Sequence, residues 1–271
     1  MADAAPQALR AILHRSAALE RFQVSHRAPA EDLAWIADYH WILHWDLGEG
    51  GSHRQQVLTH PSVHMTFLSD GQARVVGVVR GVFTETIEGR GRVVGVRFRP
   101  GGFRPFLGAP VSTITDRRIP VEDVFGPAAR STADAIIAAP DPGDAIALAE
   151  DLLRSRAPRP DPLVLEVGDI VDRIAADPAL TRVDRVAAAA GMGTRRLQRL
   201  FADYVGIGPK WVIRRYRMQD AADRAASGTD VDWAALATEL GYADQAHFTR
   251  DFSATIGMSP TRYARACAAR R

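Results

Sequence analysis

Arginine and glutamine side chains that could bind nucleic acid recur in two segments of the C-terminal half. Arg195, Gln198 and Arg199 lie in the first segment, and Gln245 and Arg250 lie in the second. Arginine can donate two hydrogen bonds to guanine, and glutamine can pair in a similar way with adenine. We therefore predict that both segments contact duplex DNA. The residues predicted to make these contacts are Thr194, Arg195, Arg196, Gln198, Arg199, Lys210, Gln245, Ala246, Thr249 and Arg250.

The two segments belong to a pattern that occurs twice in the chain. Gly191 aligns with Gly241 at an offset of 50 residues, and Phe201 aligns with Phe252 at an offset of 51. The alignment holds on both sides of a single inserted residue in the turn. This behaviour is expected of a duplicated helical unit.

Each copy has the features of a helix-turn-helix unit. A small residue, Ala187 or Ala237, allows two helices to approach closely. Four residues later a glycine can end the first helix, because glycine adopts the left-handed conformation without steric cost. Thr194 is a candidate N-cap of the second helix in the first copy. That second helix has apolar residues on one face and polar residues on the other, as expected of a recognition helix.

Basic residues are concentrated between residues 193 and 217. The same segment contains a single acid, Asp203. A local density of positive charge favours contact with the phosphate backbone. A helix expected over residues 209–226 begins in this segment, and its N-terminal amide groups could also bind phosphate. The basic residues are Arg195, Arg196, Arg199, Lys210, Arg214, Arg215 and Arg217.

The repeated stretch resembles the DNA-binding domain of the AraC/XylS family of bacterial transcription regulators. The resemblance covers roughly residues 163–268 and implies sequence-specific binding to double-stranded promoter or operator DNA. It also allows three further partners: RNA polymerase, a small-molecule effector and a second copy of the chain in a homodimer. The residues that carry it are 197–201, 206–209, Arg217, 241–245, 247–252, 257–260 and Tyr263.

Composition indicates an ordinary globular protein. The chain has 46% hydrophobic and 24% charged residues, with a formal net charge of +2. Cys267 is the only cysteine, which excludes a disulfide framework and a cysteine-rich zinc site. No apolar run approaches the roughly 20 residues that span a bilayer, and the N-terminus lacks the pattern of a secretion signal. We therefore expect a cytoplasmic protein that does not enter a membrane.

The N-terminal half shows the two-residue period of β-strands. Apolar and polar residues alternate from Tyr39, and further strands are predicted over residues 56–59, 63–68, 74–79, 82–88 and 92–98. Asp70-Gly71 is the predicted turn of a hairpin. Residues 1–27 are expected to form at most an amphipathic helix, with Leu9, Ile12, Leu13 and Leu19 on one face. About six short strands favour a small barrel or sandwich.

The predicted fold class is α+β, with a β-rich barrel or sandwich followed by an all-α domain. Residues 95–126 resemble a cupin-like N-terminal domain of some AraC-family regulators, whose function is poorly defined. The expected domains are a β-rich sensor or association domain over residues 1–126 and two helix-turn-helix units over residues 163–271. Residues 127–162 are expected to be a helical connector that ends in a proline-rich linker. Helices are expected at 103–107, 120–125, 128–139, 144–156, 163–176, 209–226 and 259–268.

Histidines in the N-terminal half raise the hypothesis of a metal site. His40 and His44 share a strand face but lie about 13 Å apart if the strand is straight, which is too far for one ion. Neither an HxH nor an HExxH motif occurs. We therefore expect no metal and no other cofactor.

The function predicted for the chain is that of a non-enzymatic transcription regulator. No nucleophile elbow, P-loop or dinucleotide fingerprint occurs, and the surroundings of Cys267 do not indicate a nucleophile. Trp41 and Trp45 share one strand face, where core packing is favoured over a ligand pocket. The N-terminal domain is expected to sense an effector or to mediate association. A purely assembling β domain and, less favoured, a cupin-type enzyme remain as alternatives.

Overall fold

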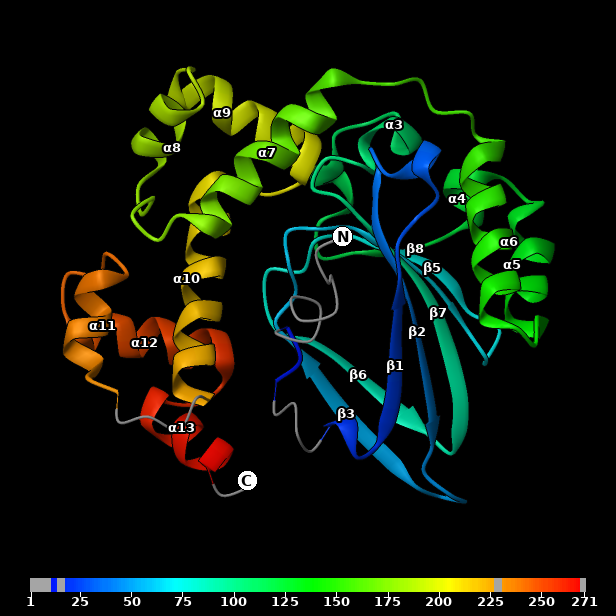
Figure 1. The fold of residues 1–271 in the computed structure, drawn as a ribbon, viewed down its shortest axis with the longest axis horizontal. Helices are drawn as coiled ribbons and strands as arrows, with labels where there is room; N and C mark the ends of the chain where they lie inside the picture. The colour runs from blue at the N-terminus through cyan, green and yellow to red at the C-terminus, as the bar shows by residue number, and fades with distance from the viewer. Residues whose placement is uncertain (1–10, 14–17, 227–230, 269–271) are drawn as a thin grey trace.

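The computed structural model describes residues 11–13, 18–226 and 231–268. It confirms the predicted α+β class, because a β-rich N-terminal part precedes an all-α part with two helix-turn-helix units (Figure 1). We call residues 18–155 the barrel domain and residues 162–268 the helical domain. Within the described ranges, no helix is both long and apolar enough to cross a membrane.

Two antiparallel sheets form the β part of the barrel domain. The larger sheet has the strand order β1-β2-β7-β4-β5-β8, and the smaller sheet pairs β3 with β6. The periodicity of the sequence predicted β2 and β4 to β7, although their ends differ by a few residues. Strand β3 begins four residues before the strand expected over residues 56–59 and shares only Gln56 and Val57 with it. The strands are β1 (Phe22–Arg27), β2 (Ala37–Asp46), β3 (Ser52–Val57), β4 (His64–Leu68), β5 (Ala73–Val76), β6 (Phe83–Glu88), β7 (Arg90–Phe98) and β8 (Arg118–Pro120).

Strand β1 corrects the expectation of a helix over residues 1–27. Phe22, Val24 and His26 alternate with exposed residues, so this segment has the two-residue period of a strand. It pairs with β2 along its whole length. Ile12 forms an isolated bridge with Val57, while Leu9 lies outside the described residues.

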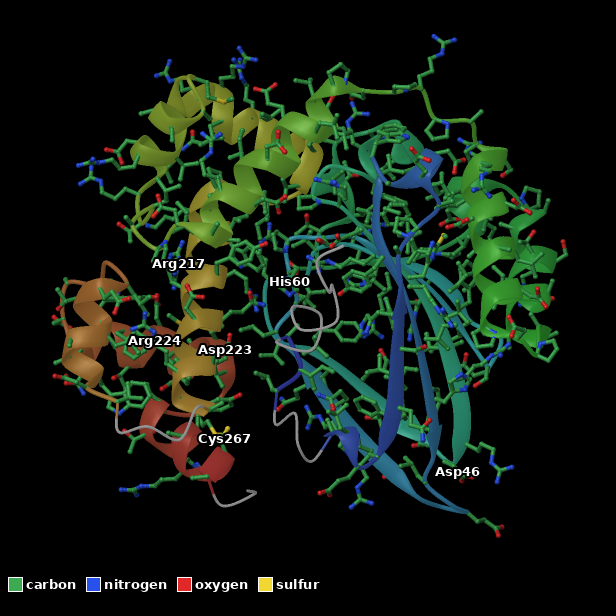
Figure 2. The ribbon with its side chains drawn as sticks, viewed as in Figure 1. Asp46, His60, Arg217, Asp223, Arg224 and Cys267 are labelled. Carbon is green, nitrogen blue, oxygen red and sulfur yellow. The ribbon has the colours of Figure 1, made fainter. Side chains whose placement is uncertain are left out.

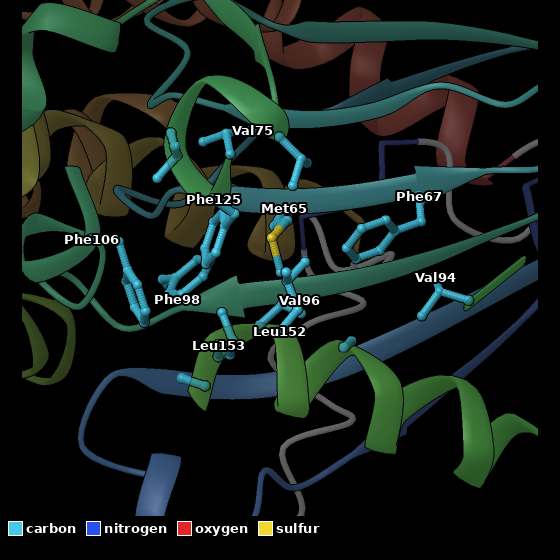
Figure 3. Packing of buried hydrophobic residues seen from close by; sticks show 14 of the residues in the cluster. Met65, Phe67, Val75, Val94, Val96, Phe98, Phe106, Phe125, Leu152 and Leu153 are labelled. Carbon is cyan, nitrogen blue, oxygen red and sulfur yellow. The ribbon is translucent and has the colours of Figure 1, made fainter. Parts of the chain in front are cut away.

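The larger sheet buries a hydrophobic core on one of its faces. Helices α5 (Ala129–Ala138) and α6 (Pro142–Ser155) cover that face (Figure 1). Met65, Phe67 and Val94 belong there to the same core cluster as Leu152 and Leu153 of α6 (Figure 3). Alternate residues of the same strands point to the opposite face, towards β3 and β6. The sheet therefore separates a packed core from a second space.

The segment predicted as a helical connector contributes to the core of the barrel domain. Ile136 of α5 and Leu153 of α6 are fully buried in it. Residues 156–161 alone join α6 to α7 (Pro162–Ala176) without helix or strand, where the proline-rich linker was expected. Domain limits at residues 126 and 162 remain proposals.

Short helices and an aromatic cluster close one end of the barrel domain. Phe98 contacts Phe103 with ring centroids 4.9 Å apart, and Phe106 contacts Phe125 at 5.5 Å. The helical turns predicted over residues 103–107 and 120–125 are present. The short elements are η1 (Glu31–Leu33), α3 (Arg104–Leu107), η2 (Val111–Ile114) and α4 (Glu122–Phe125).

The helical domain consists of two units at opposite ends of one long helix, α10 (Pro209–Ala226) (Figure 1). Each unit has its own core, in which Phe201 and Phe252 are fully buried. The barrel domain adds Val78 to the first core and Leu58 to the second. The first unit contains α7, α8 (Val183–Ala189), α9 (Thr194–Leu200) and the π-helical turn η3 (Phe201–Val205), and the second contains α11 (Trp233–Glu239), α12 (Gln245–Ile256) and α13 (Pro260–Ala268).

Candidate nucleic-acid interface and barrel cavity

Glycines in the left-handed conformation end the helices of both units. The turn between the two helices of each motif has φ = +64° at Gly191 and +79° at Gly241. The segment after each recognition helix has φ = +90° at Gly206 and +88° at Gly257. A residue with a Cβ atom is strained in this region, so the backbone favours glycine at all four positions. The predicted helix ends are confirmed.

The same backbone hydrogen bond closes both turns. The Met192 amide donates to the Ala187 carbonyl at 3.0 Å, and the Tyr242 amide donates to the Ala237 carbonyl at 2.9 Å. Ala187 and Ala237 are buried, as their predicted role in close helix packing requires. The sequence repeat is therefore also a repeat of backbone geometry.

Helix α9 exposes the polar face that was predicted for the first recognition helix. Leu197 and Leu200 are buried, while Gln198 and Arg199 are exposed. The predicted N-cap is wrong by one residue, because Gly193 caps α9 and Thr194 is its first helical residue. Glycine at this position leaves the first amide groups of α9 without a side-chain cap.

Helix α12 has the same arrangement with a stronger cap. The Asp244 carboxylate accepts a hydrogen bond of 2.6 Å from the His247 amide. Phe248 and Phe252 are buried behind the exposed face.

Most of the residues predicted to contact DNA are exposed, and only Thr249 is half-buried. The exposed ones are Thr194, Arg195, Arg196, Gln198, Arg199, Lys210, Gln245, Ala246 and Arg250.

Two members of the predicted basic cluster are inaccessible to phosphate. Arg217 is 1% exposed and donates through Nη2 to the carbonyl oxygens of Ile174 and Asp177. Figure 2 shows it on α10, close to the first unit. Arg215 is 3% exposed and faces the barrel domain. The positive surface is therefore smaller than the sequence indicated.

Asp251 pairs with Arg214 of α10, with 2.5 Å between the Asp251 Oδ1 and Arg214 Nη2 atoms. The acid next to Arg250 therefore compensates a charge on the joining helix and does not orient Arg250. Arg196 lies 3.8 Å from Glu166, a weak ion pair at an exposed site. Arg195, Arg199, Lys210 and Arg250 have no ion pair with any described residue.

The turns that precede the two proline-initiated helices differ in their surroundings. The Thr115 hydroxyl of the barrel domain donates a hydrogen bond of 2.6 Å to the Gly206 carbonyl, and Gly206 is buried. Gly257, at the equivalent position in the second unit, is exposed. The first unit is therefore anchored to the barrel domain at this turn, whereas the second turn remains accessible.

The histidines of the barrel domain do not converge on one point. Among the described residues, no group of three or more His, Cys, Asp and Glu side chains could hold a metal ion. His40 instead forms a buried pair with Glu150 of α6, with 3.0 Å between His40 Nε2 and Glu150 Oε1. Burial lowers the pKa of His40 and outweighs the opposing effect of Glu150.

A cavity of about 210 Å³ lies between the two sheets, on the face of the larger sheet opposite to α5 and α6. Trp41 and Trp45 of β2 line it together with Phe22 of β1 and Phe83 of β6. The sequence favoured core packing for both tryptophans, and that interpretation is wrong. Residue alternation along β2 directs them away from the packed core, in which Ile42 takes part.

The polar groups at the cavity are neutral or paired. Burial and, to a smaller extent, the charge of Arg97 lower the pKa of His64 to about 3. The same two causes lower the pKa of His26. Arg74 lies 3.2 Å from Glu85, whose carboxylate also pairs with Arg118 at 3.0 Å.

Loops beside the cavity contact α10 directly. Arg215 of α10 donates to the Arg80 carbonyl at 2.6 Å and to the Gly81 carbonyl at 3.1 Å. Its guanidinium lies 4.4 Å from the centroid of the Trp211 ring. His60, which lines the cavity, lies 6.0 Å from the Tyr216 ring, and Figure 2 shows it between the strands and α10. The cavity wall and the helix that joins the two units are therefore in contact.

Two known families match different parts of the chain. Residues 25–120 match a domain of unknown function (DUF6597), and residues 186–266 match a helix-turn-helix domain. The second match includes both turns and both candidate recognition helices. The C-terminal part is therefore an AraC-type helix-turn-helix domain.

Several solved structures are also similar to the chain. One is a transcriptional regulator with an AraC-type DNA-binding domain from Chromobacterium violaceum, with 20% identity over 39% of this chain and 92% of that chain and a TM-score of 0.35. The C-terminal domain of AraT from Geobacillus stearothermophilus has 25% identity over 40% and 87%, with a TM-score of 0.35. ToxT from Vibrio cholerae O395 has 10% identity over 92% and 98%, with a TM-score of 0.39.

Proposed function

We propose that this AraC-type DNA-binding transcriptional regulator reads two adjacent segments of the major groove, one with α9 and one with α12. The observation that carries the proposal is the geometric repeat, in which two buried apolar stripes each leave a face with arginine and glutamine exposed. Arg199 and Arg250 are the candidate base contacts, because each is exposed and has no ion pair with the described residues. Lys210, at the start of α10, is the candidate phosphate contact.

The length of α10 supports simultaneous contact with two groove segments. Its 18 residues extend about 27 Å at 1.5 Å per residue. Successive major grooves on one face of the duplex are about 34 Å apart. Helix α9 precedes the start of α10, and α12 packs alongside it, where Asp251 pairs with Arg214, so the lateral offsets of the two recognition helices must supply the remaining distance. One chain should therefore occupy an asymmetric site, since the exposed faces of α9 and α12 differ.

The barrel domain acts in this proposal as a non-enzymatic effector sensor. Its cavity adjoins the loop of residues 79–81, whose carbonyl oxygens bind Arg215. A ligand that alters this loop would change how α10 is held, and α10 sets the separation of the two recognition helices. We place the protein in the bacterial cytoplasm with its DNA target. Contacts with RNA polymerase and self-association remain proposals that rest on the resemblance alone.

A spacing experiment tests the DNA-binding proposal. Sites for the full-length chain are selected from a random duplex library, and about five base pairs, half a helical turn, are inserted between the two half-sites. The insertion moves one half-site to the opposite face of the duplex, so affinity should fall at least about tenfold, equal to about 1.4 kcal/mol. Undiminished binding, or selected sites with a single contiguous recognition sequence, would overturn the proposal.

A further inference from the structure

We infer that the barrel cavity binds a small organic anion, with its anionic group beside His64 and its apolar ring against Trp41. The inference rests on the proposed sensing function of the barrel domain and specifies its ligand. Three properties support it: the accessible ring nitrogens of His64, the arginines around this residue on the sheet, and the excess of these arginines over the acids that pair with them.

His64 offers a hydrogen-bond donor to the cavity. It is half-buried, lines the cavity and has its ring centroid 6.3 Å from that of Trp41. Its ring nitrogens form no hydrogen bond with any described residue, yet they keep accessible surface, whereas Nε1 of Trp41 is buried. Burial and, to a smaller extent, Arg97 lower the pKa of His64 to about 3. The ring is therefore neutral at pH 7, and one of its nitrogens carries a proton that a ligand can accept in a hydrogen bond.

Three arginines surround His64 on the cavity face of the larger sheet. Arg97 of β7 lies opposite His64 on one side, and Val76 of β5 lies opposite it on the other. Arg118 of β8 is in turn opposite Val76. Arg74 lies two residues before Val76 and therefore points to the same face. A ligand group at His64 thus has positive charge on both sides along the sheet.

The acids that pair with these arginines do not compensate them fully. Glu85 alone serves both Arg74 at 3.2 Å and Arg118 at 3.0 Å. Asp38 lies 3.4 Å from Arg97, and its side chain is 39% exposed, so water screens its charge. Within the described residues, three guanidinium groups therefore form ion pairs with two carboxylates.

The excess of positive charge reaches the cavity lining. After burial, the charge of Arg97 is the second cause that lowers the pKa of both His26 and His64. An anion that enters the cavity loses hydration, which is costly unless it gains charge pairing and hydrogen bonds. The arginines and the N–H group of His64 supply both. A cation would meet repulsion at the same place.

Two indole rings provide a surface for the apolar part of the ligand. Trp41 is opposite Gly95 of β7, and Trp45 is opposite Gly91. A Cβ atom on Gly95 would lie 2.1 Å from Cε2 of Trp41, so the glycine allows that ring to lie against the strand. The cavity of about 210 Å³ exceeds the roughly 150 Å³ of an apolar cavity known to bind benzene. A bicyclic aromatic acid is therefore an appropriate probe.

Indole-3-carboxylate and indole-3-carboxamide form a matched pair of probes, because they share one ring system and differ in charge. Binding to the full-length chain is measured by calorimetry at pH 7.5, and the imidazole resonances are followed by NMR. Wild-type protein should bind the carboxylate at least about tenfold more tightly than the carboxamide. Saturating carboxylate should shift the imidazole resonances that are missing from the spectrum of His64→Gln.

Two variants change the charge beside the site in opposite directions. Glu85→Gln should strengthen binding of the carboxylate about 3- to 30-fold, because it removes a like charge from a partly buried site, and should leave the carboxamide unaffected. Arg118→Gln should weaken the carboxylate by a similar factor. Glu88→Gln is the matched control, since it removes the same charge from the exposed side of the same strand and should change neither affinity.

A loss of packing cannot imitate this pattern, because it would weaken both probes and would strengthen neither. Equal affinities of the two probes in the wild type would overturn the inference. So would a Glu85→Gln variant that binds the carboxylate no more tightly than the wild type does, or carboxylate binding that leaves the resonances of His64 in place.

DNA affinity is measured on the same samples, so that failure of the ligand inference can be distinguished from failure of the proposed function. A chain that binds its selected DNA site but shows no preference for the carboxylate refutes the ligand class and leaves DNA reading intact. A chain that binds the carboxylate with the expected preference but has no specific DNA site refutes the proposed function. The expected preference together with a specific DNA site supports both proposals.

Discussion

Nη2 of Arg215 lies 2.6 Å from the carbonyl oxygen of Arg80, so that the helix joining the two DNA-reading units is bonded directly to a loop of the barrel domain. The Gly81 carbonyl accepts a second bond from the same nitrogen atom. Burial lowers the pKa of Arg215 to about 10, so the guanidinium remains protonated at neutral pH. The charge is solvated by carbonyl dipoles and by the ring of Trp211.

Arg215→Lys should destabilise the protein, because an ammonium group cannot reproduce the planar guanidinium stacked on Trp211. The expected loss in free energy of unfolding is about 1–3 kcal/mol, measured by urea denaturation. Arg214→Lys is the neighbouring control, and its half-exposed pair with Asp251 predicts a loss below about 1 kcal/mol. Equal losses of unfolding free energy in the two variants would show that the buried contacts of Arg215 stabilise the protein no more than the surface pair of Arg214 does.

Arg199→Ala and Arg250→Ala should each weaken specific DNA binding by about 1–3 kcal/mol, because each removes one candidate base contact. Fluorescence anisotropy with duplexes that carry single base-pair changes should show that specificity is lost in different halves of the site. Arg130→Ala, on the exposed surface of α5, removes the same charge elsewhere and should leave specificity unchanged. Loss of specificity at the same base pairs in both variants contradicts the assignment of one groove segment to each helix.

DNA affinity should fall steeply with salt concentration. If the three exposed basic residues that are not candidate base contacts (Arg195, Arg196 and Lys210) each neutralise one phosphate, the log–log slope should be about −3. Lys210→Ala should reduce its magnitude by about 1. The control Arg90→Ala changes the pair with Asp46, at the far end of the barrel in Figure 2, and should not alter the slope. A slope that Lys210→Ala leaves unchanged would remove Lys210 from the interface.

Mild acid should destabilise the barrel domain through His64. The pKa of His64 is about 3 in the folded chain because of burial and Arg97, whereas a histidine in an unfolded chain titrates near about 6.5. The unfolded state therefore binds the proton first, and stability present above about pH 6.5 is lost as the pH falls towards 3. At pH 4.5 the loss should be about 2–3 kcal/mol, since each pH unit below the pKa of the unfolded chain costs about 1.4 kcal/mol.

His64→Gln should remove most of this acid sensitivity, measured as the slope of unfolding free energy against pH between about 6.5 and 4.5. His247→Gln is a suitable control, because His247 is exposed on α12. An unchanged slope in His64→Gln would mean that other groups dominate the acid response.

Local patterns predicted most of the elements that support the candidate site. The three- to four-residue period of apolar side chains and the paired glycines predicted α9, α10 and α12, because helix caps and amphipathic faces depend on neighbouring residues. Alternation likewise predicted β2, β4 to β7 and the end of β3. Strand β1 was missed because only Phe22 of its alternating residues is fully buried, so its pattern is weak.

Features that depend on distant residues could not be predicted in this way. Arg217 resembles a surface base in the sequence, yet carbonyl oxygens of Ile174 and Asp177 from another part of the chain solvate it in the interior. Trp41 alternates correctly for a half-buried strand, but whether a core or a cavity faces it depends on the placement of β6 and α6. The hydrophobic period gives the inward face of a strand and does not reveal which sheet or helix covers it.

The two units are attached to the barrel domain by different kinds of contact. Thr115 and Arg104 hold the first unit through directional bonds to the Gly206 carbonyl and the Asp203 carboxylate. At the second unit, Leu58 of the barrel joins the apolar core, and its carbonyl accepts one hydrogen bond of 3.2 Å, which comes from Gln219 of α10 and not from the recognition helix α12. Displacement of the domains should therefore shift α12 more readily than α9. The stretch of DNA protected from nuclease would then shorten from one end. The half of the site bound by α12 would be released while α9 keeps the protein on the promoter.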